Sequence, residues 1–309
     1  MNCAGIDVSK AKLDMCIWPI GTVEAYENSD EGIDALVRAV AAANVDLVAV
    51  EHTGRFTRKL MNHLNASGIS AVFVDPRQVR HFGVAVGQEA KTDRLDARLI
   101  ARYAALLEPT LRPVTSEEEY TLRYAMVRRR QLVDHRTKEK TRSHEEHPSE
   151  LADSIARHHA WLDNEIERIE TFVRAMVNAQ PASKARFDIL TTMPGVGDVL
   201  AWTLISDLPE LGRIDPKPLT QLVGLAPRPL ESGTLTKRRR IRGGRFFVRR
   251  ALYMASLNAA RKDERLALFR RRLLDDGKPP MVTRVAVMRK MLLILNAMVR
   301  DGKPWNEAS

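Results

Sequence analysis

Apolar residues in the first hundred positions fall into two alternating patterns. Some form short runs bounded by turn residues, which is typical of strands, and others recur every three or four residues, which is typical of helices. Strands are expected over residues 3–9, 12–18, 22–27, 46–50 and 69–74, and helices after 28–30 and over 55–66. Strands that alternate with helices predict an α/β layer in which the later strands are parallel.

A further helix is expected to begin near Asp93, because Leu95, Leu99 and Ile100 recur at helical spacing. Asp93 and Asp96 are three residues apart, so their carboxylates lie on one face with Cβ atoms about 5–6 Å apart. Like charges placed this way are tolerated when a cation lies between them, and paired carboxylates are how many proteins hold magnesium. Acidic residues are also common in an ordinary first helical turn.

Asp7 and Glu51 each end a predicted central strand. Ligands of open α/β sheets bind at that edge, so Asp7, Glu51, Asp93 and Asp96 are expected to converge. Asp14, which lies in the middle of a strand, and Asp75, which begins an Asp-Pro turn, fit this site less well. Cations flank the proposed site and are expected either to hold phosphates or to be ordinary surface charges; they are Arg77, Arg80 and Lys91.

The middle of the chain is helical and basic. Glu108-Pro109 and Arg112-Pro113 end the first part, and residues 117–144 form a polar helix with a weak apolar seam. In a second helix the apolar positions from Leu162 onward are spaced four and three residues apart, which predicts a coiled coil, either as a hairpin or between subunits. The expected domains are residues 1–110, 115–180 and 185–309.

The last third is predicted to be mostly helical, with a basic arm. The arm and the helix after it contain no acid between residues 237 and 250, and Gly243-Gly244 bends the chain between them. An uncompensated run of this density is typical of a surface that meets a polyanion. Phe246 and Phe247 are expected to contact the core, and residues 281–298 to form a core or subunit-contact helix. The basic residues are Lys237, Arg238, Arg239, Arg240, Arg242, Arg245, Arg249 and Arg250.

Composition supports a polyanionic partner. The 309 residues carry a formal net charge of +10, with a pI near 9.8. Cys3 and Cys16 provide neither a disulfide framework nor zinc-ligand spacing. No leader or membrane-spanning run is evident, so a cytoplasmic, nucleoid-associated bacterial protein is expected.

Four segments resemble the DEDD transposases of insertion-sequence family one-hundred-ten: GIDVSK, AVEHTGRF, VDPRQVRHF and GQEAKTDRLDARLIARY. The resemblance covers most of the first hundred residues and resumes near Ile189. It implies a RuvC-like (RNase H-like) first domain, and it implies that Asp7, Glu51, Asp93 and Asp96 hold Mg²⁺, with Mn²⁺ as a substitute. The apolar patterns described above add a helical coiled-coil middle and a mostly α-helical C-terminal domain to this expected fold.

Ser232, followed by Gly233, is by its residue type an ordinary turn residue. The resemblance implies a different role, because the family has a nucleophilic serine in this Ser-Gly context before a basic segment. It further implies a covalent phosphoserine-type intermediate, donor and target DNA, a structured guide (bridge) RNA, and a homo-oligomer between a dimer and a tetramer.

Three other functions remain open from the sequence. A structure-selective nuclease of the Holliday-junction resolvase type uses the same four acids to activate water and leaves Ser232 idle. A DNA invertase has the same domains. A non-catalytic DNA- or RNA-binding protein uses the basic arm alone.

Overall fold

The computed structural model describes residues 1–51, 56–87, 93–109, 116–232 and 235–305; for 93–95, 228–232 and 235–240 it describes the backbone only. The chain divides into two compact units, Met1–Thr115 and Ser116–Ser309. The expected helical middle therefore belongs to the second unit, and the expected three-domain division stays a prediction.

The first unit is built on a five-stranded sheet with the order β3-β2-β1-β4-β5. β2 pairs antiparallel with both β1 and β3, whereas β1, β4 and β5 run parallel to one another. This arrangement confirms the expected α/β layer with its later strands parallel. The strands are β1 Cys3–Val8, β2 Lys12–Trp18, β3 Val23–Glu27, β4 Leu47–Glu51 and β5 Ala71–Val74.

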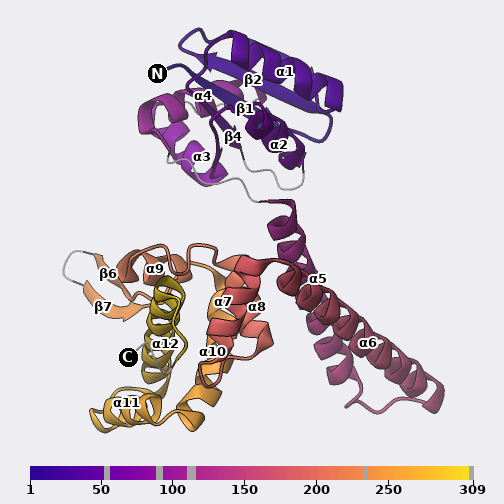
Figure 1. Cartoon of the computed structure of the whole chain (residues 1–309), viewed down its shortest axis with the longest axis vertical. Coiled ribbons are helices and arrows are strands. Elements are labelled where there is room, and N and C mark those ends of the chain that lie inside the picture. Colours follow the sequence, from indigo (N-terminus) through magenta and orange to yellow (C-terminus); the bar gives the residue numbers. More distant parts are fainter. Residues whose placement is uncertain (52–55, 88–92, 110–115, 233–234, 306–309) are drawn as a thin grey trace. The chain divides into compact units, whose positions relative to one another are not determined.

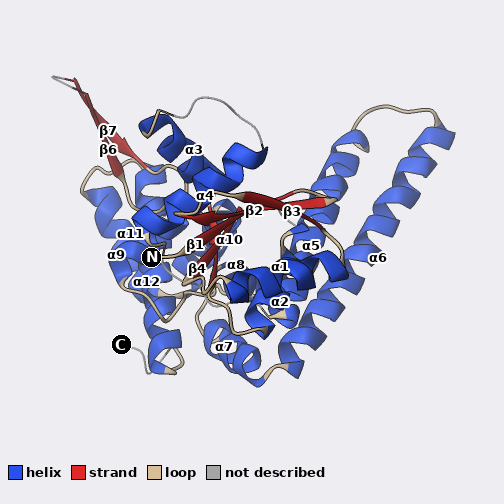
Figure 2. Ribbon diagram, turned by 90° about the horizontal axis from the view of Figure 1, so that it is seen from above, coloured by secondary structure: helices blue, strands red, loops and turns tan. Residues whose placement is uncertain are grey.

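Helices cover both faces of this sheet (Figure 2). One face, which includes Ile6, Leu13 and Val50, packs against α1 Asp30–Ala42 and α2 Arg58–Ala66. The other face includes Cys3, Cys16 and Ala49 and packs against α3 Pro76–Ala85 and α4 Asp93–Leu107. Because side chains alternate along a strand, each strand contributes to both cores.

α3 was not expected from the sequence. Asp75, interpreted there as part of an Asp-Pro turn, is the residue that caps α3: its Oδ1 accepts a hydrogen bond from the Arg77 backbone N–H at 2.8 Å. Pro76 follows at the first helical position, where its missing N–H costs nothing. Asp-Pro is therefore a helix start here.

The second unit begins with two long helices that pack side by side, α5 Glu117–Arg142 and α6 Ser149–Ala179 (Figure 1). Ser116 and Glu119 form a capping box at the start of α5. A buried cluster between the helices includes Leu132, Leu162 and Ile166. The predicted coiled coil itself stays a prediction.

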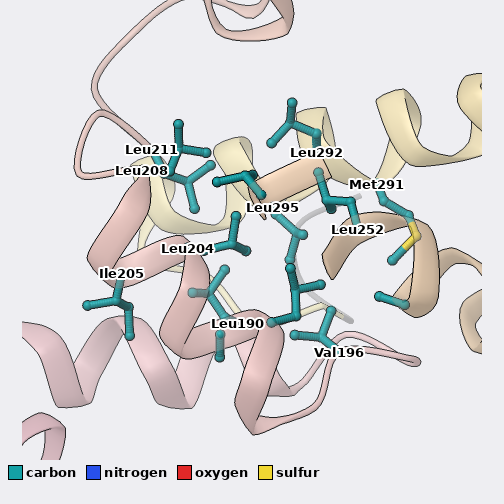
Figure 3. Packing of buried hydrophobic residues seen from close by; sticks show 14 of the residues in the cluster. Leu190, Val196, Leu204, Ile205, Leu208, Leu211, Leu252, Met291, Leu292 and Leu295 are labelled. Carbon is teal, nitrogen blue, oxygen red and sulfur yellow. The ribbon is translucent and has the colours of Figure 1, made fainter. Parts of the chain in front are cut away.

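The helices that follow contribute most of the main core of this unit, part of which is seen in Figure 3. Leu204, Leu252 and Leu295 come from three of these helices and are fully buried. The final helix therefore belongs to the core of its own unit. The helices are α7 Pro181–Thr191, α8 Asp198–Asp207, α9 Pro216–Val223, α10 Phe246–Lys262, α11 Glu264–Asp275 and α12 Pro280–Asp301.

A two-stranded antiparallel hairpin, β6 Arg228–Ser232 and β7 Leu235–Arg240, carries the basic arm. The apolar pattern of this segment did not predict strands. Gly243 and Gly244 follow with φ values of +69° and +70°, which glycine adopts readily, and they bend the chain into α10 as expected. None of the helices in the described part of the chain is both long and apolar enough to cross a membrane.

Candidate active site and nucleic-acid surface

Strand register brings Asp7 and Glu51 next to each other in the sheet. Ile6 of β1 pairs with Val50 of β4 in a parallel ladder, so the next residue on each strand is an acid. Ile6 and Val50 face α1 and α2, and the alternation of side chains places Asp7 and Glu51 on the opposite face, which α3 and α4 cover.

α4 runs antiparallel to β1 across that face. Its C-terminal half, including Tyr103, packs with Cys3 and Leu47 at the beginnings of the strands. Its first turn therefore lies toward the strand ends, where Asp7 and Glu51 are. Asp93 is the first residue of α4, and Asp96 follows one turn later. The backbone therefore directs the four predicted acids toward one edge of the first unit. This edge, with Asp7, Glu51, Asp93 and Asp96, is called the acidic edge below.

Gly5 makes this approach possible. A Cβ atom on Gly5 would lie 2.2 Å from the Ala101 nitrogen and 2.5 Å from the Ala97 oxygen of α4. The helix backbone thus rests directly on β1, two residues before Asp7.

The chemistry of the acidic edge suits a hard divalent cation. Carboxylate oxygens are the ligands that Mg²⁺ prefers. The positive end of the α4 dipole stabilises the negative charges of carboxylates that lie near the start of this helix. Cys16 lies on the same face, packed with Ala97 and Ala101, and burial raises the pKa of its thiol. A neutral thiol does not compete for such a cation.

Among the described side chains, no three His, Cys, Asp or Glu residues are grouped closely enough to hold a metal ion. Asp7, Glu51 and Asp96 belong to that search, whereas the Asp93 side chain lies outside it. The four-acid metal site therefore stays a prediction that the backbone arrangement supports.

The flanking cations lie on or near α3. Arg77 and Arg80 are both exposed on this helix, which meets α4 through the edge-on contact of Phe82 with Tyr103 at 5.6 Å between ring centroids. The predicted phosphate-binding role of both arginines is untested. Lys91 lies outside the described residues.

Ser232 is the last residue of β6 and pairs with Leu235 of β7. It therefore lies at the turn end of the hairpin, in the second unit. The basic residues of the arm follow along β7, whose side chains are outside the described part; they are Lys237, Arg238, Arg239 and Arg240.

The arginines around α10 are partly balanced by acids from other elements. Both terminal nitrogens of Arg245 donate to Glu210, and one also donates to the Asp207 carbonyl oxygen at 2.7 Å. Arg250 lies 3.4 Å from Asp134. The basic run that looked uncompensated in the sequence is therefore partly compensated in the fold.

Arg249 and Arg242 differ in their surroundings. Arg249 donates to the Val223 carbonyl oxygen at 2.9 Å and also to Gly243, so it joins α9 to the bend before α10. Arg242 is exposed. The structure gives Arg245 and Arg249 a role within the fold, and contact of any of these arginines with nucleic acid remains a prediction.

Phe246 and Phe247 are exposed, with 57% and 42% of their surface accessible. The expectation that they contact the core was wrong, because Val248 and Leu252, one turn apart, take the inward face of α10. The Arg130 guanidinium carbon lies 4.2 Å from the Phe247 ring centroid. An exposed aromatic pair beside cations is a typical stacking surface for unpaired bases.

The turn Pro194-Gly195-Val196-Gly197 directly precedes α8. A Cβ on Gly195 would lie 2.5 Å from the Ala259 nitrogen of α10, so close packing explains this glycine. Asp198 begins α8 and pairs with Arg174 at 3.0 Å. An anionic side chain thus already lies at this helix start.

Comparisons with known proteins show which sequences are similar to this chain. Residues 4–146 match a family model described as "Transposase", and residues 187–270 match one described as "Transposase IS116/IS110/IS902 family". The chain is also 27% identical over 317 aligned residues to the "Pilin gene-inverting protein" of Moraxella bovis and to that of Moraxella lacunata. Each alignment covers 98% of this chain and 97% of the relative.

Proposed function

The chain belongs to the IS116/IS110/IS902 family of transposases, and on that premise we propose that it cuts and rejoins the DNA of an insertion sequence through a covalent bond to Ser232. The observation that carries this proposal is the acidic edge of the first unit. There Asp7 and Glu51 lie next to each other near the ends of β1 and β4, and α4, which begins with Asp93, crosses the same face of the sheet.

The four acids are proposed to hold Mg²⁺, or Mn²⁺ in its place. When bound, such an ion polarises a phosphoryl oxygen and stabilises the charge that develops on it. The carboxylates would hold the ion at this edge of the sheet, where the scissile phosphate would bind to it. The exposed side chains of Arg77 and Arg80 would contact the flanking DNA backbone.

Ser232 is proposed as the nucleophile. Its hydroxyl loses a proton as the oxygen–phosphorus bond forms, and the bridging ester bond of the DNA strand breaks, leaving a hydroxyl on the released end. A hydroxyl of another strand end then attacks the phosphoserine, which restores Ser232 and joins the new pair of strands. The energy of the original ester is retained, so strand exchange requires no nucleotide triphosphate.

The nearby sequence supplies no His–Asp pair to activate Ser232. Activation is therefore proposed to come from the acidic edge, brought to Ser232 within one chain or from a second subunit. A homo-oligomer, from a dimer to a tetramer, and a structured guide RNA that pairs with donor and target DNA complete the proposal.

A DNA invertase is the second candidate. It is favoured by the alignment over nearly the whole chain with two proteins named for inverting a pilin gene. Inversion and transposition share the same cutting and rejoining chemistry and differ in the arrangement of the sites. Exchange between two inverted sites on one plasmid, compared with exchange between two plasmids, separates these functions.

The deciding experiment is covalent trapping. The protein is incubated with guide RNA, donor and target DNA, and Mg²⁺, then denatured and examined for a protein–DNA adduct. We expect an adduct with the wild type and with Thr234→Ala and Glu31→Ala, the latter changing an acid on α1 across the sheet. The adduct should be lost in Ser232→Ala and in Asp7→Ala.

Cleavage without an adduct, unchanged by Ser232→Ala, would instead indicate a hydrolytic nuclease of the resolvase type. Binding without cleavage would leave only a nucleic-acid-binding function. Recombination that proceeds equally well without RNA would contradict the guide-RNA part alone.

A further inference from the structure

Asp14 is a buried acid directly beside the proposed metal site. It lies in β2 and pairs with Asp7 of β1 in the antiparallel ladder, so both side chains lie on the sheet face that α4 covers. Only 3% of Asp14 is exposed. No described group donates a hydrogen bond to its Oδ1 atom, yet the Lys12 ammonium nitrogen lies 2.9 Å from that oxygen, close enough for an ion pair.

Two carboxylates in this relation repel each other. Directly opposite residues of an antiparallel pair have Cβ atoms about 4.5–5.5 Å apart, and like charges there are destabilising. Burial strengthens the repulsion because less water screens it. A cation near the pair reduces this repulsion, and in this structure the Lys12 ammonium group lies beside Asp14.

Lys12 is suited to neutralise Asp14 only until another cation binds there. It is two residues from Asp14 on the same strand, hence on the same face. Its side chain is 48% exposed, whereas that of Asp14 is 4% exposed. The Lys12 ammonium group can therefore move into water with little loss of solvation, whereas the Asp14 carboxylate stays buried.

We propose that Asp14 is a fifth carboxylate of the acidic site, and that the Lys12 ammonium takes the place of the divalent ion in the metal-free protein. When the ion binds, its charge replaces that of Lys12 beside Asp14, and Lys12 turns toward solvent. This inference rests on the proposed function, because it presumes that Asp7 belongs to a metal site.

The two residues then affect metal affinity in opposite directions. Asp14→Asn removes negative charge from the site and should weaken binding about tenfold, in the range seen for residues that support metal ligands. Lys12→Met removes a competing cation and should strengthen binding about threefold or more. A purely structural pair predicts no change, or a loss of affinity in both variants.

The test is a titration of the full-length protein with Mn²⁺ alone, without DNA or RNA, in which free Mn²⁺ is measured by its electron paramagnetic resonance signal. Lys10→Met is the matched control, because it removes the same charge from an exposed turn residue two positions away and should change the affinity less than twofold. Circular dichroism confirms that each variant is folded.

Each outcome bears on the inference. If Asp14→Asn fails to fold, the change in Mn²⁺ affinity of Lys12→Met tests the inference. Lys12→Met is expected to fold because the Lys12 side chain is half exposed. Unchanged or weaker binding by Lys12→Met, with binding lost in Asp7→Asn, overturns this inference and leaves the proposed function in place. If the wild type binds no Mn²⁺, both are overturned.

Discussion

Gly5 shows how a single residue positions a functional edge. Its missing side chain lets the α4 backbone rest on β1, and the same helix carries Asp93 and Asp96 toward Asp7. The sequence predicted that these acids converge, but it did not indicate the close approach. A glycine inside a strand can also mark a bulge or a bend, so the sequence alone does not indicate that a helix packs against it.

We expect Gly5→Ala to destabilise the first unit by about 1–3 kcal/mol or more, because the new Cβ overlaps backbone atoms that cannot turn aside. Chemical denaturation monitored by circular dichroism measures the effect. Gly197→Ala is the control: a Cβ there meets nothing within 4 Å and its φ of −103° suits alanine. Equal stability of the two variants would contradict the close packing of α4 on β1.

At the scale of elements, the region from α9 to α10 contains two kinds of arginine. Some make contacts that stabilise the fold, and others are exposed to a ligand. Arg245 is engaged with Glu210 and the end of α8, whereas Arg242 is exposed before the bend. The sequence shows both as members of one basic run. Glu210, which distinguishes them, is 35 residues from Arg245, and sequence spacing does not reveal such a pairing.

Arg245→Gln is therefore expected to lower the free energy of unfolding by about 1 kcal/mol, a figure that allows for the partial exposure of the pair. Arg242→Gln should leave unfolding unchanged and weaken binding to DNA, most clearly at low salt. Thermal unfolding and fluorescence anisotropy with a labelled duplex measure the two effects. A large loss of stability in Arg242→Gln would contradict this division.

The hairpin and the aromatic pair show where sequence patterns were insufficient. Ser232 and Leu235 are separated by Gly-Thr, and a two-residue spacing with glycine first favours a tight hairpin. The many arginines that follow lack the alternating apolar pattern of a strand, so the hairpin was not predicted. Phe246 and Phe247 precede the inward positions Val248 and Leu252, so helical phase excludes them from the core. In contrast, the strands of the first unit were predictable because their apolar runs are short and bounded by turn residues.

At the scale of the whole molecule, the chain is two units with separate cores. We expect residues 1–109 and 116–309, expressed separately, each to unfold cooperatively. Each retains its own buried clusters, which is the main source of stability in a domain. Differential scanning calorimetry of the two fragments and of the full chain checks this. A fragment that lacks a cooperative transition would show that its unit depends on the other.

The separation of the hairpin from the acidic edge has a consequence for safety in the cell. Ser232 belongs to one unit and the four acids belong to the other. If both act on one phosphate, neither half of the chain is a DNA-cutting enzyme when it occurs alone, for example as a truncated product. On the proposed mechanism, strand cleavage therefore requires both units on the same DNA, and a fragment that contains only one of them is expected not to form the covalent bond.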